Sequence, residues 1–116
     1  MQITLKCFVL GENLSNSFKV KIDTGDTVLD LKKLIFEKKK NDITSKYPSE
    51  LKLWKVDIGK DDEEKRKILR NQSRYTSELE GTELSPDESI SKSWHSTGNR
   101  QPKENSIHVI VRGKLD

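Results

Sequence analysis

Residues 51–58 read LKLWKVDI and lie near the middle of a chain of 116 residues. In an extended strand, alternate side chains point to opposite faces. The stretch therefore has two apolar faces, made up of Leu51 and Leu53 on one side and Trp54, Val56 and Ile58 on the other. A strand of this kind is buried on both sides, or it carries a binding surface on one. The rest of the sequence bears on which of these holds for Trp54.

The composition describes one small, highly charged domain. Hydrophobic residues make up 31% of the chain and charged residues 35%, with 22 basic and 19 acidic residues and a formal net charge of +3. We therefore expect one modest core and not two. The balance between the two signs of charge gives no indication that this domain binds nucleic acid.

The N-terminus and the single cysteine further limit the classes of protein to which the chain can belong. MQITLKCFVL has no basic region ahead of an unbroken apolar run, so no signal peptide is visible. No apolar run approaches the roughly 20 residues of a membrane helix, and we expect no membrane-spanning segment. One cysteine, Cys7, excludes an intrachain disulfide framework, and its place in the alternation predicts an inert thiol facing the core.

Three further strands and one main helix follow from periodicity. Residues 3–9, 18–22 and 107–111 alternate as strands, and the first two form a hairpin. The helix begins after TGDT at 24–27, where Thr27 and Asp30 are a cap pair. Its core stripe consists of Val28, Leu31 and Ile35. A second, smaller stripe consists of Leu29 and Phe36, for which the alternatives are a covering loop and an interface, including that of a homodimer.

Residues 60–105 form a charged insert before the last strand. Within it, DDEEKRKILRNQ favours one short helix followed by a loop, and residues 90–94 favour a short packed segment. The order of elements predicts an α+β fold. More specifically, we expect a mixed sheet packed on one main helix, in which the first and last strands pair at the centre, as in β-grasp folds.

Two families resemble parts of the chain. MQI at the start, DTVLDLKKLI in the helix and IHVIVR in the last strand resemble ubiquitin. After Arg112, however, the chain reads GKLD and lacks the terminal diglycine through which ubiquitin is conjugated. The resemblance therefore implies the ubiquitin fold without the chemistry of a conjugated modifier.

The closer resemblance is to the N-terminal domain of Crinkler effectors. LKLW at 51–54 resembles the opening of the family motif L-x-L-F-L-A-K, and KVD at 55–57 resembles a fungal variant of it. GDTVLDLKKLI resembles the family helix, residues 90–94 its short insert, and HVIV at 108–111 its H-V-L-V junction. The motifs occur in the family order and cover essentially the whole chain.

This resemblance implies a domain at 1–112, followed at 113–116 either by a tail or by the junction to a C-terminal domain outside the chain. It implies a non-enzymatic delivery or translocation module that also binds proteins, in a secreted effector acting in host plant cells, including the host nucleus. The alternatives are an intracellular ubiquitin-like adaptor, or the N-terminal fragment of an effector whose NTPase, nuclease or kinase activity lies in the missing part. The translocation-motif strand consists of Leu51, Lys52, Leu53, Trp54, Lys55 and Val56.

No catalytic, cofactor or metal residue is predicted. His95 and His108 lie on different elements, and alternation places Cys7 and His108 on opposite faces of the sheet, so a thiol enzyme is not expected. No phosphate-binding glycine loop occurs. The acidic run at 61–64 is typical of a solvated segment next to basic residues.

The candidate interaction surface consists of Trp54, His108 and Ile110, which are predicted to point away from the helix. Tryptophan is enriched at the centres of protein interfaces, so such a patch would bind a host protein or a second copy of the chain. The alternative is that the 60–105 insert folds back and covers Trp54. The sequence leaves both alternatives open.

Overall fold

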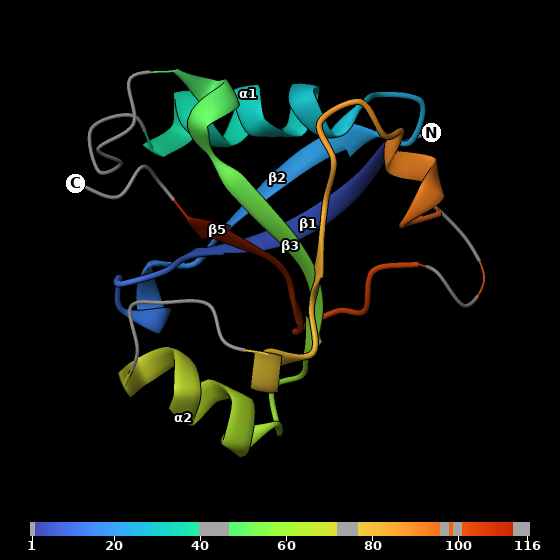
Figure 1. The fold of residues 1–116 in the computed structure, drawn as a ribbon. Helices are drawn as coiled ribbons and strands as arrows, with labels where there is room; N and C mark the ends of the chain where they lie inside the picture. Colours follow the sequence, from blue (N-terminus) through green and yellow to red (C-terminus); the bar gives the residue numbers. More distant parts are fainter. Residues whose placement is uncertain (1, 40–46, 72–76, 96–97, 99–100, 113–116) are drawn as a thin grey trace.

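The computed structural model describes residues 2–39, 47–71, 77–95, 98 and 101–112, and these form a mixed sheet between two helices (Figure 1). Within this part the sheet has five strands in the order β2-β1-β5-β3-β4. The strands are β1 (Gln2–Val9), β2 (Phe18–Asp23), β3 (Lys52–Ile58), β4 (Thr82–Glu83) and β5 (Ile107–Arg112). The helices are α1 (Val28–Lys39) and α2 (Glu63–Asn71), with short 3-10 helices at Leu14–Asn16, Pro48–Glu50, Ser77–Leu79 and Ile90–Lys92.

The first and last strands lie side by side at the centre of the sheet, as predicted. β1 runs parallel to β5, with Cys7 opposite Val109 and Val9 opposite Val111. β2 and β3 flank this pair and run antiparallel to their neighbours. The hairpin, the crossing helix and the central parallel pair confirm the α+β, β-grasp prediction.

Helix α1 begins where the cap pair predicts. The Thr27 backbone N–H donates to Asp30 Oδ2 at 3.0 Å, and the Asp30 N–H donates to Thr27 Oγ1 at 3.3 Å, which is a reciprocal capping box. The stripe that includes Leu31 and Ile35 is fully buried against the sheet. Lys32 is also buried, although its polarity argued against a core position.

Apolar side chains form two cores, one on each face of the sheet. The α1-side core lies between the sheet and α1 and consists of Ile3, Leu5, Cys7, Val9, Val20, Ile22, Val28, Leu31, Ile35, Leu51, Leu53, Leu84, Ile90, Trp94, Val109 and Val111. The α2-side core consists of Phe8, Trp54, Val56, Ile58, Leu69, Leu79, Ile107 and Ile110. The expectation of a single core is therefore wrong.

The described part of the insert contains more secondary structure than predicted. The predicted short helix is α2, and the packed segment at 90–94 begins with the 3-10 helix Ile90–Lys92 and has Ile90 and Trp94 buried. The two-residue strand β4 was not predicted, since it is too short to show a pattern. Residues 72–76 of the predicted loop after α2, and the predicted tail at 113–116, lie outside the described residues.

Candidate interaction site

The motif strand is mostly buried. Leu51 and Leu53 both belong to the α1-side core, while Trp54 and Val56 belong to the α2-side core. Lys52 is exposed and Lys55 is half-buried. The division of β3 between two apolar faces is thus confirmed. In the folded domain this motif is first of all the strand that joins the two cores.

Trp54 is covered and does not centre an open patch. Its side chain is 8% exposed, and Ile110, its direct neighbour on β5, is fully buried. Both point away from α1, as predicted, but Leu69 of α2 and Leu79 of the following 3-10 helix pack over this face. Of the two alternatives that the sequence leaves open, the structure favours the one in which the insert covers Trp54.

His108, the third residue of that patch, is buried and hydrogen-bonded through both ring nitrogens. Nδ1 accepts the Lys6 backbone N–H at 2.9 Å, and Nε2 lies 2.6 Å from the Lys103 carbonyl oxygen. A carbonyl oxygen only accepts, so Nε2 carries the proton. Burial lowers the pKa of His108, which the Lys103 carbonyl and the Asp57 carboxylate partly offset. The neutral ring therefore links β1 to the loop before β5.

The second predicted surface, Leu29 and Phe36, is half-buried. Phe36 packs against the α1-side core. The backbone N–H groups of Val28 and Leu29 donate to the carbonyl oxygens of Glu88 and Pro86, at 2.9 and 3.0 Å. The insert thus lies alongside the first turn of α1, which favours the covering-loop alternative for Leu29.

Lys55 joins the motif strand to the insert, a role that its sequence position does not reveal. Its ammonium donates to the Ser93 carbonyl oxygen at 2.8 Å and lies 5.7 Å from the centre of the Trp94 ring. The second contact is within the range of a cation–π interaction. The motif lysine therefore holds the 90–94 segment against the edge of the α1-side core.

Cys7 and His108 are held in structural positions. Cys7 is fully buried, and burial raises the pKa of its thiol far above the usual range, which disfavours the thiolate. Among the described residues, no three or more His, Cys, Asp or Glu side chains gather closely enough to hold a metal ion. Within the same residues, no helix combines the length and the apolar character needed to cross a membrane.

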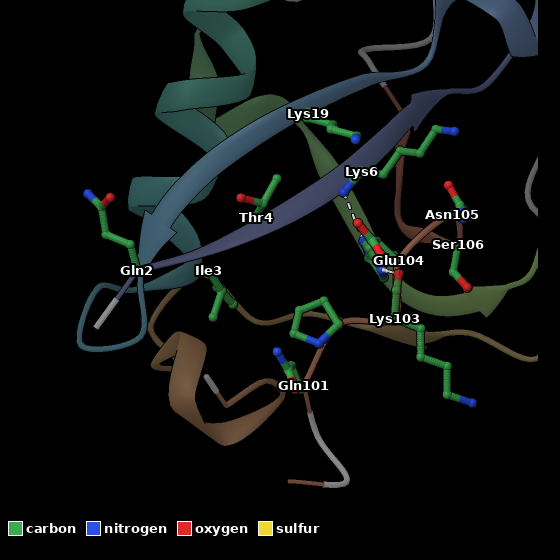
Figure 2. Close-up of a pocket in the computed structure, with 12 residues that line it drawn as sticks. Gln2, Ile3, Thr4, Lys6, Lys19, Gln101, Lys103, Glu104, Asn105 and Ser106 are labelled. Carbon is green, nitrogen blue, oxygen red and sulfur yellow. Dashed lines mark hydrogen bonds between the residues drawn. The ribbon is translucent and has the colours of Figure 1, made fainter. Parts of the chain in front are cut away.

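A polar groove remains open beside β1 (Figure 2). It has a volume of about 350 Å³ and lies between the strands β1 and β2 and the loop before β5. Its lining consists of Gln2, Ile3, Thr4, Lys6, Lys19, Gln101, Pro102, Lys103, Glu104, Asn105, Ser106 and His108. Of the predicted site residues, this groove includes His108 alone.

The sequence contains a signal for this groove in its first two strands. Lys6 and Lys19 occupy outward positions of the two hairpin strands, and the structure places them directly opposite each other. Like charges at such paired positions are unfavourable in a sheet. A pair of lysines in the predicted hairpin therefore pointed to this part of the surface.

These features define a β-grasp, ubiquitin-like domain whose second sheet face is covered by an insert. The structure is similar to the solution structure of the putative Ras interaction domain of AFD-1, isoform a, from Caenorhabditis elegans, with a TM-score of 0.56 over 97% of this chain and 95% of that one. The two sequences are 15% identical, so this likeness shows the fold alone.

The sequence comparisons identify the family. Residues 3–112 match the Crinkler effector protein N-terminal domain. The chain is 36% identical over 111 residues to Crinkler effector protein 1 of Rhizophagus irregularis. This chain therefore belongs to the Crinkler effector family. The match covers 96% of the chain but 21% of that relative, so the chain corresponds to a small part of the curated protein.

Proposed function

We propose that this chain is a non-enzymatic delivery and protein-interaction module of a secreted effector that acts inside host plant cells. The observation that carries the proposal is the match of residues 3–112 to the N-terminal domain of Crinkler effectors. The structure is compatible with it, because Cys7 and His108 both serve the fold. Cys7 is fully buried in the α1-side core, and both ring nitrogens of His108 form hydrogen bonds.

The burial of the motif strand specifies how delivery would depend on folding. Four of its six side chains, Leu51, Leu53, Trp54 and Val56, are buried. A receptor would reach them as a linear peptide only after the domain unfolds. We therefore propose that the folded domain, with Lys52 as the exposed side chain of this motif, is the unit that is exported and enters the host.

The test is a delivery assay with the whole chain placed ahead of a reporter fragment. The fusion is made in the producing organism, and the complementary fragment is expressed in the cytosol of the recipient plant cell. We expect complementation with the native chain and a strong reduction when the chain is omitted. Equal signals with and without the chain would overturn the proposal. Retention of the fusion in the producing cells would favour the intracellular adaptor instead.

Two variants separate folding from surface recognition in this assay. Leu53→Ala weakens the α1-side core, whereas Lys52→Glu changes an exposed charge on the neighbouring residue of the same strand. If the folded domain is delivered, Leu53→Ala lowers the signal in proportion to its loss of folded protein. Undiminished delivery of an unfolded Leu53→Ala chain would show that a linear segment is recognised, against the proposal.

A further inference from the structure

We propose that the groove beside the first half of β1 docks an extended, acidic peptide segment of a partner protein, which adds a strand to β1. The proposal specifies a partner for the interaction part of the proposed function and rests on that part. It is carried by three features of the described residues, which are an unpaired stretch of strand, a groove of suitable size and an excess of positive charge.

The first half of β1 has a strand neighbour on one side. β2 pairs with β1 from Gln2 to Cys7, but β5 pairs with it only from Cys7 to Val9. Before that point, β1 faces the groove and the loop of residues 101–106. A strand edge without a partner presents backbone donors and acceptors that can pair with another chain.

The hydrogen bond of Lys6 shows which backbone groups face the open side. Its N–H reaches His108 on β5, where the imidazole takes the place of a backbone acceptor. In a strand, the backbone groups of alternate residues point to the same side. The N–H and C=O of Thr4 and Gln2 therefore point into the groove, and they are placed to pair with an incoming strand.

The size of the groove suits a short segment of backbone. Its volume of about 350 Å³ is at the lower end of the range for small-ligand sites, roughly 300–1,000 Å³. Figure 2 shows β1 on one side and residues 101–106 on the other, with Thr4 and Gln101 on opposite sides of the opening. The site is therefore large enough for a few residues of a strand whose ends extend beyond it.

The charge of the groove selects an acidic segment. Because the Lys6 N–H is directed away from β2, Lys6 and Lys19 form a non-hydrogen-bonded pair, in which opposite side chains come closest. Lys103 lies at the rim, where it also approaches Asp57 at 3.4 Å. Against these three lysines, the lining contains one acidic residue, Glu104. Carboxylates on the incoming strand would relieve the repulsion between Lys6 and Lys19.

Backbone pairing and charge have different roles in this site. Exposed ion pairs contribute about 0–1 kcal/mol each, so lysines alone do not give stable binding. An added strand supplies affinity through main-chain hydrogen bonds, and its side chains supply selectivity. This combination favours a peptide over a free phosphate or a nucleic acid, which would use the lysines but not the backbone of β1.

The experiment titrates the isotope-labelled full chain with a blocked heptapeptide of alternating glutamate and valine and follows amide chemical shifts. We expect the largest shifts at residues 2–6 and slower amide exchange at Thr4. A peptide in which lysine replaces each glutamate should not bind. The acidic peptide with every backbone amide N-methylated should also bind weakly, because neither of its edges can then donate a hydrogen bond to β1.

Charge variants test the same site from the protein side. Lys19→Glu should weaken binding of the acidic peptide roughly tenfold, since it removes one attraction and adds one repulsion. Lys33→Glu is the matched control, because Lys33 is exposed on α1 at the other face of the sheet, and it should bind like the native chain. Both side chains are exposed, so both variants should fold.

Several results would overturn the proposal. These are shifts confined to the outer edge of β2, equal binding of the N-methylated peptide, or an affinity that does not respond to Lys19→Glu. Binding of inorganic phosphate or an oligonucleotide with the same shifts, without binding of the acidic peptide, would assign the groove to anions of another class. Because the titration uses the isolated chain, its failure is distinct from failure of delivery in the host assay.

Discussion

The two faces of the sheet are covered by elements of very different composition. On one face, α1 buries Val28, Leu31, Lys32 and Ile35 along a continuous stripe and begins with a capping box. On the other face, the highly charged α2 contributes Leu69, and the 3-10 helix after it contributes Leu79. The difference shows that a mostly polar insert suffices to close a second core when the strands supply most of its apolar surface.

The same comparison predicts unequal local stability. α1 is held at its start by the capping box and along its length by three buried apolar residues, Val28, Leu31 and Ile35. α2 carries ion pairs such as Lys65 with Asp62 and Arg70 with Glu63, whose side chains are partly or mostly exposed. Exposed ion pairs of that kind contribute little to the stability of a helix. We expect α2 to open at a lower free energy than α1.

Neighbouring residues of β3 allow the two cores to be broken one at a time. Leu53→Ala should lower the free energy of unfolding by about 2–5 kcal/mol, and Trp54→Ala by about 3–5 kcal/mol, because each removes a buried side chain. Denaturant unfolding measures both losses. A native-like midpoint for Trp54→Ala would contradict the packing of the α2-side core.

Leu69→Ala should act locally. We expect a loss of about 2 kcal/mol in the stability of α2, with rapid amide exchange from residues 63–71, because Leu69 is the buried anchor of that helix. In a Trp94→Phe background, acrylamide quenching of Trp54 should increase. Lys67→Ala, at an exposed position of the same helix, is the control. Equal acceleration of exchange in α1 would show that the two cores open together.

Acid should weaken the link that His108 makes between β1 and the loop before β5. Because the folded protein lowers the pKa of His108, the unfolded chain binds the proton more tightly. The contribution of His108 to the free energy of unfolding should therefore be fully present above the ordinary pKa of 6.5. It should decrease as the pH falls through that value toward the lowered pKa of the folded protein. The measurement is the denaturation midpoint against pH, in the native chain and in His108→Gln.

The expected pH range separates His108 from the carboxyl groups. Hydrogen bonds from backbone N–H groups lower the pKa of Asp23 and Asp30 below 3.8, so their contributions are lost at more acidic pH. His95→Gln provides a control, since His95 is exposed. If His108→Gln shows the same decrease just below pH 6.5 as the native chain, His108 is not its source.

Lys32→Met should give the smallest change, and in the opposite direction. Burial lowers the pKa of Lys32, with Glu83 offsetting and Lys52 adding to the shift, so the ammonium is poorly placed in the folded chain. We expect a gain of about 0.5–1 kcal/mol in the free energy of unfolding, because an apolar side chain of similar length suits a 6%-exposed position. Lys33→Met, next to it and exposed, should change stability by less than about 0.5 kcal/mol. A net loss for Lys32→Met would mean that the charge contributes to the fold.

The regular parts of the fold could be predicted because their patterns are local. Alternation in β1 and β3, the Thr27–Asp30 cap and the stripe of α1 each depend on residues within a few positions of one another. The central pairing of the first and last strands followed from the order of elements. The burial of Lys32 could not be predicted in this way. Its spacing from Val28 fits the buried stripe, but a charged side chain is expected to be exposed to solvent.

The candidate site, in contrast, depends on contacts between residues that are far apart in the sequence. Whether Trp54 is covered is decided by Leu69 and Leu79, two apolar residues in a charged insert, and neither stands out as a core residue. His108 finds its partner at Lys6, 102 residues away. The pairing of Lys6 with Lys19 could be predicted from the hairpin, but the groove beside it requires the position of the loop at 101–106.

The central place of β5 has a consequence for the timing of folding. Its residues, Ile107–Arg112, belong to the last part of the domain to be synthesised, yet they separate β1 from β3 in the finished sheet. Until they emerge from the ribosome, β1 and β3 have no strand between them. Contacts between segments so far apart in sequence also form slowly. The central sheet, and with it the cooperative fold of the domain, should therefore be completed only after this final strand has been released.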